Sequence, residues 1–175
     1  MTLTPTSAPL VAGRSPVTWY CYLTLGLFTY LLNIQGNILP FLRAELALSY
    51  RAVSLHSSAL AAGLILAGLL GDRIVRRCGR RLALLISVAG SSVGAILLCI
   101  APAPWASIGS CALIGVLGGL IPGTVPAVLA ETHDETGRDV AYAEANATSY
   151  ACAVLGPLAT GLFVVLAVGW RVSVR

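Results

Sequence analysis

The sequence predicts an all-α polytopic membrane protein with five transmembrane helices. Hydrophobic residues make up 57% of the 175 residues and charged residues only 10%, less than half of the roughly 25% usual in soluble domains. Five apolar runs reach the length of about 18 residues that a bilayer requires. Apolar residues follow one another in these runs without alternation, which excludes a transmembrane β-barrel. The protein is therefore expected to sit in a lipid bilayer.

The helices are expected where the apolar runs lie, because lipid offers no hydrogen-bond partner to a free backbone group. The spans cover residues 17–41, 53–71, 82–101, 105–130 and 140–168, and residues 1–16 form an N-terminal tail. The first run is about twice as long as the apolar part of a secretory signal, so it is interpreted as a retained helix. Pro102 to Pro104 joins the third and fourth spans so briefly that they must be antiparallel neighbours.

The segment Gly68 to Arg81, with the sequence GLLGDRIVRRCGRR, separates the second and third spans. It holds five arginines, and one arginine at the bilayer centre costs about 2.5 to 3.5 kcal/mol. We interpret it as a short loop outside the membrane.

Arginine counts then predict the orientation. With the N-terminus in the cytoplasm, seven arginines lie on the inner side and four on the outer side, which agrees with the positive-inside rule. The inner ones are Arg14, the five of the segment just described and Arg138, and the outer ones are Arg43, Arg51, Arg171 and Arg175. The chain is therefore expected in the plasma (inner) membrane with a cytoplasmic N-terminus.

Small residues recur at every fourth position in two spans, which predicts close helix packing. One row is Ala59, Gly63, Ala67 and Gly71, and the other is Gly115, Gly119, Gly123 and Ala127. Pro122 and Pro126 are expected to kink the fourth span.

Polar side chains follow one face of the first span and one face of the fifth. The first stripe is Tyr22, Gly26, Tyr30, Asn33 and Asn37, and the second includes Asn146, Ser149 and Tyr150, with Glu144 nearby. Polar groups at membrane depth face a bundle interior or a wet cavity, so these residues are candidates for a substrate path. Interhelical hydrogen bonding, worth about 0.6 kcal/mol per bond, explains them equally well, and the sequence leaves both readings open.

The arginine segment resembles the loop between the second and third helices of major facilitator superfamily transporters. The resemblance rests on Gly68, Asp72-Arg73 and Gly79-Arg80-Arg81, although five residues rather than one separate the last two groups. Gly156, Pro157 and Gly161 are similar to an element of the fifth helix of antiporters in that family, and Gly169-Trp170-Arg171 is similar to the junction before its sixth helix. The resemblance implies that residues 17–175 are most of the family's N-terminal six-helix bundle.

The same resemblance implies roles for individual residues. Gly68 packs closely, and Asp72 interacts with arginine and helix-end dipoles. Arg73, Gly79, Arg80 and Arg81 hold an inner gate in one state, and Glu131 is the expected ion-pair partner of Arg73. The alternative is that these residues form only a solvated, positively charged membrane anchor.

The function implied is secondary active transport of a small solute by alternating access, with efflux or antiport favoured by the Gly156–Gly161 element. The partners are the bilayer, the solute and the remaining transporter helices, with protons left open as the coupling ion through Glu144 or His56. The alternatives are a non-transporting membrane subunit or gene remnant, and an intramembrane hydrolase using Ser92 of a GxSxG match. No metal, cofactor or nucleic acid is expected, because the cysteines are scattered and no nucleotide motif occurs.

Overall fold

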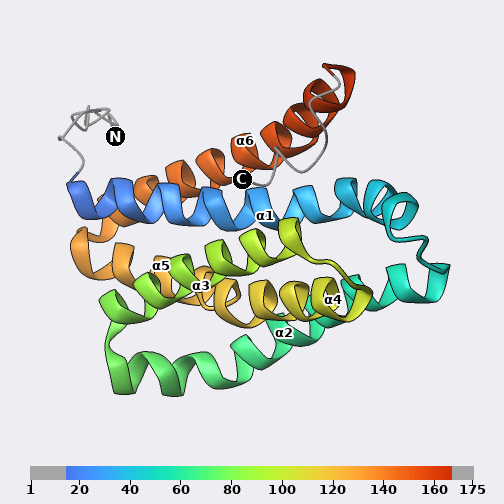
Figure 1. Cartoon of the computed structure of the whole chain (residues 1–175). Coiled ribbons are helices and arrows are strands. Elements are labelled where there is room, and N and C mark those ends of the chain that lie inside the picture. The colour runs from blue at the N-terminus through green and yellow to red at the C-terminus, as the bar shows by residue number, and fades with distance from the viewer. Residues whose placement is uncertain (1–14, 167–175) are drawn as a thin grey trace, which may run out of the picture.

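The computed structural model describes residues 15–166, and these residues form a bundle of long helices (Figure 1). The helices are α1 (Pro16–Glu45), α2 (Tyr50–Cys78), α3 (Arg80–Ile100), α4 (Pro104–Leu113), α5 (Ile121–Thr132) and α6 (Glu135–Val165), with a π-helical turn Ile114–Gly118 after α4. Five segments are long and apolar enough to cross a membrane, counting Pro104–Thr132 as one. This confirms the predicted all-α membrane class. Most of the tail and the Gly169-Trp170-Arg171 junction lie outside the described residues.

Three helices begin with side-chain caps that the sequence supplies. Ser15 accepts a hydrogen bond from Thr18 N at 3.3 Å, Ser49 from Ala52 N at 3.2 Å, and Asp134 from Gly137 N at 2.9 Å. Each cap satisfies one backbone N–H that the first helical turn leaves without a partner. As a result α2 and α6 start three and five residues before the apolar runs that predicted them, and α1 starts one residue before its run.

The arginine segment is not a loop, and this prediction was wrong. Helix α2 continues through Asp72 and the next six residues to Cys78, and a single residue, Gly79, separates it from α3. Arginine favours helix, and no proline or glycine interrupts residues 72–78, so the helix persists beyond the apolar run. Gly79 has φ +79°, a conformation that glycine adopts without the steric penalty of a Cβ atom, and it turns the chain into α3.

The fourth span breaks before its prolines rather than at them. The π-helical turn Ile114–Gly118 and the turn residues Gly119 and Leu120 separate α4 from α5, and Pro122 lies in the first turn of α5. The Pro122 ring would clash with the carbonyl of Gly118 and cannot donate a hydrogen bond to it, which prevents a continuous α-helix there. Pro126 lies inside α5.

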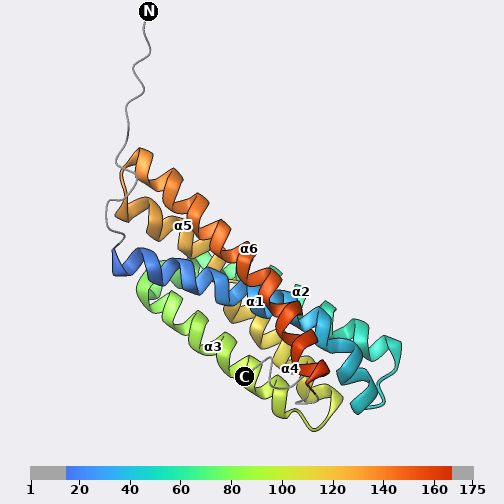
Figure 2. The same ribbon diagram turned by 90° about the horizontal axis from the view of Figure 1, so that it is seen from above.

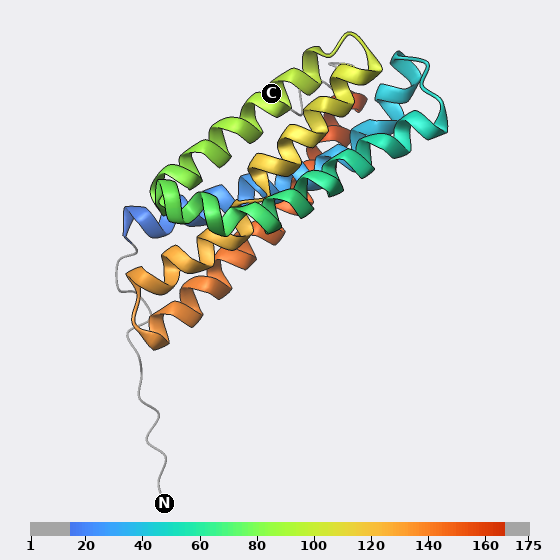
Figure 3. The ribbon, with the colours of Figure 1, turned by 90° about the horizontal axis from the view of Figure 1, so that it is seen from below.

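Helix α1 runs through the bundle beside α6, and α2 lies along α4 (Figures 1 and 3). The α1–α6 contact is the most extensive in the fold, and Figure 2 shows the two helices crossing. The starts of α1, α3 and α6 meet the ends of α2 and α5 at one end of the bundle. We call this the arginine end.

The rows of small residues pack closely at Gly63, Gly115 and Gly119, whereas no neighbour among the described residues lies within 4 Å of a Cβ atom on Gly123. A Cβ atom on Gly63 would lie 2.7 Å from Ala112 O, and one on Gly115 would overlap Leu60 O, so α2 approaches the fourth span with backbone against backbone. Gly119 packs in the same way on Ala67. The spacing of small residues predicted close helix packing, and the structure shows that α2 and the fourth span are the partners at these positions.

Candidate functional site

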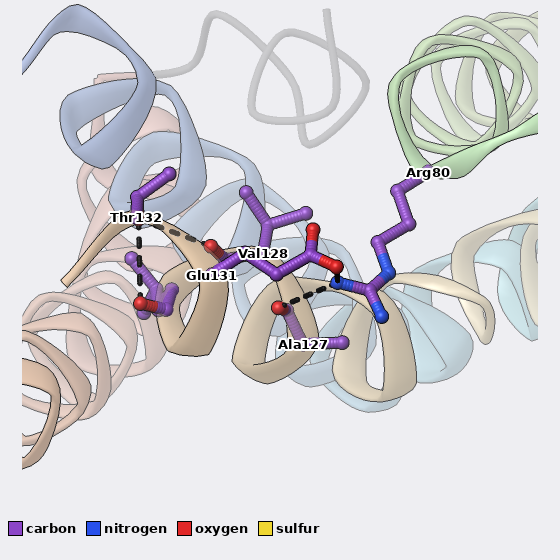
Figure 4. Close-up of polar contacts among 6 residues, drawn as sticks. Arg80, Ala127, Val128, Glu131 and Thr132 are labelled. Atoms are coloured by element: carbon purple, nitrogen blue, oxygen red, sulfur yellow. Dashed lines mark hydrogen bonds and ion pairs between the residues drawn. The ribbon is translucent and has the colours of Figure 1, made fainter. Parts of the chain in front are cut away.

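The arginine end holds an ion pair that connects α3 to α5. Arg80 pairs with Glu131 and also donates a hydrogen bond to Ala127 O at 2.9 Å, as Figure 4 shows. The side chains are 35% and 64% exposed, so water screens the pair and its contribution is about 0 to 1 kcal/mol. The expected partner of Glu131 was Arg73, and this was wrong. Arg73 lies on α2, whereas α3 begins with Arg80 beside the end of α5.

Asp72 pairs with Arg76, one turn further along α2. Arg76 lies among the five residues between Asp72-Arg73 and Gly79-Arg80-Arg81, and the sequence-based set of gate residues omitted it. An acidic and a basic residue four positions apart on a helix are neighbours, so this spacing in the sequence indicates the pair. Both side chains are more than 60% exposed, so the pair lies on the surface of the bundle.

Two expectations for α2 are not met within the described chain. No atom lies within 4 Å of the position of a Cβ atom on Gly68, so nothing in residues 15–166 packs closely on it. Arg73 forms no ion pair among these residues, and the same holds for Arg81 at the start of α3. Gly79 has a definite role, because it makes the turn that places Arg80 against α5.

The first half of the polar stripe on α1 is a helix contact. Tyr22 is 2% exposed, and its hydroxyl donates to Glu144 Oε2 at 2.7 Å. One turn further, Gly26 lies against Cys152, where an added Cβ would be 2.8 Å from the sulfur. Thr29, which the stripe did not include, hydrogen-bonds Ser149. This half of the stripe joins α1 to α6 by polar contacts and does not face an open path.

The second half of the stripe is exposed. Asn33 donates to Thr29 O at 2.8 Å and Asn37 donates to Asn33 O at 2.9 Å, so each amide nitrogen bonds its own helix. The amide oxygens have no donor among the described residues. On α6, Asn146 donates to Tyr142 O at 2.9 Å. A further partner can therefore reach the second half of the stripe but not the first.

The other candidates lie along the same two helices. Tyr30 is partly buried, and Tyr150 is 70% exposed. Gly156 is buried against α1, with Tyr30 O 3.6 Å from the position of its Cβ, whereas Pro157 and Gly161 are exposed. Within the described residues, Gly156 is thus the one member of the antiporter-like element with a packing role.

Two buried polar pairs lie outside the polar stripes, and one of them includes His56, which the sequence analysis named with Glu144 as a possible proton-coupling residue. His56 is fully buried, with Nε2 2.8 Å from Ser107 Oγ and Nδ1 2.7 Å from Ala52 O, and it joins α2 to α4. Gln35 donates to Cys111 Sγ at 3.4 Å between α1 and α4. A single histidine or glutamine inside an apolar run indicates such a contact from the sequence, because a polar group in a membrane span pairs with another group inside the bundle.

The fold and the site together define a helical integral membrane protein with a charged contact at one end and polar contacts between its spans. The GxSxG match lies in the middle of α3, without the strand and sharp turn that a nucleophile elbow requires.

Residues 19–174 match the Major Facilitator Superfamily, and the chain belongs to this family. It is 33% identical over 158 residues to the multidrug efflux pump LfrA of Mycolicibacterium smegmatis (strain ATCC 700084 / mc(2)155). The match covers 85% of this chain and 31% of that protein, so the chain spans about a third of the length of this relative. The protein is a member of a transporter family, and the resemblance inferred from the sequence is confirmed.

Proposed function

We propose that the chain forms part of a secondary active transporter that exports a small organic molecule by alternating access, with protons as the coupling ion. The similarity to a protein named as a multidrug efflux pump supports export. The observation on which the proposal rests is the hydrogen bond from Tyr22 to Glu144, which places a carboxyl group between two spans.

Glu144 suits proton coupling because of its surroundings. It lies nine residues after the start of α6, or about 14 Å along the helix, and it is partly buried. The carboxylate of Glu144 accepts the hydrogen bond from the tyrosine hydroxyl when it is ionised, and it becomes a neutral carboxyl group when it adds a proton. In this proposal a change in its charge alters the α1–α6 contact, which is the largest in the bundle, and so connects proton uptake to helix movement.

The arginine end is proposed to act as the inner gate, with the N-terminus in the cytoplasm. Arg80 holds α3 to α5 through Glu131 and Ala127 O. Because the pair is partly exposed, its low free energy suits a contact that breaks and reforms in each cycle. Asp72 and Arg76 add a second pair on α2 at the same end.

The test uses the transporter assembled from this chain and the helices that complete the two-half fold, reconstituted in liposomes. Glu144→Gln should abolish export driven by a pH gradient while retaining exchange of labelled for unlabelled substrate, which needs no net proton movement. Glu135→Gln is the matched control, because Glu135 is exposed in the first turn of α6. Gradient-driven export by Glu144→Gln at the wild-type rate would contradict the proposed coupling role.

A second arm tests the gate. Asp72→Asn should slow turnover without preventing membrane insertion, because the arginines that orient the chain remain. Substrate binding should decrease less than flux. Wild-type flux by this variant at normal abundance would show that the Asp72–Arg76 pair has no part in gating.

A further inference from the structure

A cleft of about 610 Å³ opens at the arginine end between α1, α3 and α5. Its walls are mostly apolar and include Leu85 of α3 and Val128 of α5, and its charged rim includes Arg81 and Glu131. Tyr20 of α1 also lines it. The Arg80–Glu131 contact and the α1–α6 contact do not fill this cleft.

The cleft has an unmatched positive charge. Glu131 neutralises Arg80, whereas Arg81, the next residue, forms no ion pair within residues 15–166. The N-terminus of α3 adds to this potential, because it has no side-chain cap and its first backbone hydrogen bond runs from Ala83 N to Gly79 O at 3.0 Å.

Tyr20, one of the residues that line the cleft, carries an unsatisfied hydrogen-bonding group. The hydroxyl oxygen of Tyr20 is buried and has no hydrogen-bond partner in the described part of the chain. A buried hydroxyl without a partner is costly, so a ligand atom that accepts its hydrogen bond is favoured. Tyr20 of α1 and Arg81 of α3 are thus two residues with available donors that line the same cleft.

The walls distinguish a lipid from a water-soluble anion. Val17 and Leu85 line the cleft while remaining 46% and 49% exposed, so the apolar wall continues onto the outer surface of the bundle, where lipid chains lie. The arginines mark the boundary between the membrane and water. A ligand with a phosphate at the rim and hydrocarbon below it fits both features.

We propose that this cleft binds one anionic phospholipid, with its phosphate at Arg81 and Tyr20 and an acyl chain along Val17 and Leu85. Basic pockets between transmembrane helices bind anionic headgroups in this way. The site uses neither Glu144 nor Asp72, and lipid binding there does not depend on transport.

Native mass spectrometry of the purified chain, residues 1–175, tests the site by titration with phosphatidylglycerol or phosphatidylcholine. The wild type should bind one phosphatidylglycerol several-fold more tightly than phosphatidylcholine. Arg81→Gln should weaken phosphatidylglycerol binding about five-fold, the effect of one basic residue at a membrane surface, and should leave phosphatidylcholine binding unchanged. Arg81→Lys should retain most of the preference, and Tyr20→Phe should reduce it.

Arg73→Gln is the matched control, because Arg73 is exposed at the same end without lining the cleft. Equal losses in Arg73→Gln and Arg81→Gln would show general attraction to the basic surface and overturn the proposal. Equal affinity of the wild type for the two lipids would overturn it as well. Glycerophosphoglycerol, the headgroup without acyl chains, should not displace the lipid at the same concentration. Displacement as efficient as by the lipid itself would show a site for soluble anions instead.

Discussion

The contact between α2 and the fourth span gives the sharpest test of the packing, through the substitution Gly63→Ala. The added Cβ would lie 2.7 Å from both Ala112 O and Val116 N, and both neighbours are backbone atoms that no rotamer change can move. Ordinary contact begins at 3.4 Å, so the helices must separate by about 0.7 Å (3.4 − 2.7). A gap of 0.5 to 1 Å loses about a quarter to a half of the dispersion attraction of each atom pair.

The expected cost is about 1 to 3 kcal/mol, the usual range for overpacking a well-packed contact. The higher helix propensity of alanine does not offset it, because helices that have separated within a membrane remain helical. The loss in the free energy of unfolding is measured by titrating the chain with dodecyl sulfate in mixed micelles. Circular dichroism or tryptophan fluorescence follows the unfolding.

Gly68→Ala is the matched control on the same helix. Beyond its own helical turn, no atom of residues 15–166 lies within 4 Å of its Cβ position, so the free energy of unfolding should change by less than about 0.5 kcal/mol. Equal stability of the two variants would refute the backbone-to-backbone approach of α2 and the fourth span.

Three further predictions concern the polar contacts and the orientation, and a fourth concerns transport. In a double-mutant cycle, His56→Phe and Ser107→Ala should show a coupling free energy of about 0.6 kcal/mol in dodecyl sulfate unfolding, and additive effects would show that the 2.8 Å contact does not stabilise the fold. Arg80→Gln should lower the free energy of unfolding by at most about 1 kcal/mol because its pair is partly exposed, and a larger loss would mean that the pair is desolvated. A membrane-impermeant maleimide should label the exposed Cys78 quickly in inverted vesicles but not the buried Cys111, and labelling of Cys78 only in right-side-out vesicles would contradict a cytoplasmic N-terminus. Residues 1–175 alone should insert into liposomes without saturable substrate flux, and flux above that of empty liposomes would show that the chain suffices for transport.

The polar residues show the limit of prediction from periodicity. The four-residue spacing placed Tyr22 and Gly26 correctly on one helical face, and the structure places both against α6. The same spacing extended that face to Asn33 and Asn37, which the structure leaves exposed. Figure 2 shows that α6 crosses α1, so one straight face of α1 does not stay against α6 along its whole length.

The sequence by itself determined the membrane class, the five spans, the family and the close packing of the helix faces that carry rows of small residues. These properties depend on local apolar content and on the recurrence of glycine along one helix, which adjacent residues specify. Only the tertiary structure decided which polar groups meet. Tyr22 and Glu144 are 122 positions apart in the chain, and Glu131 pairs with Arg80 rather than Arg73. Such partners depend on the rotation, crossing and register of packed helices, which the pattern within one helix does not contain.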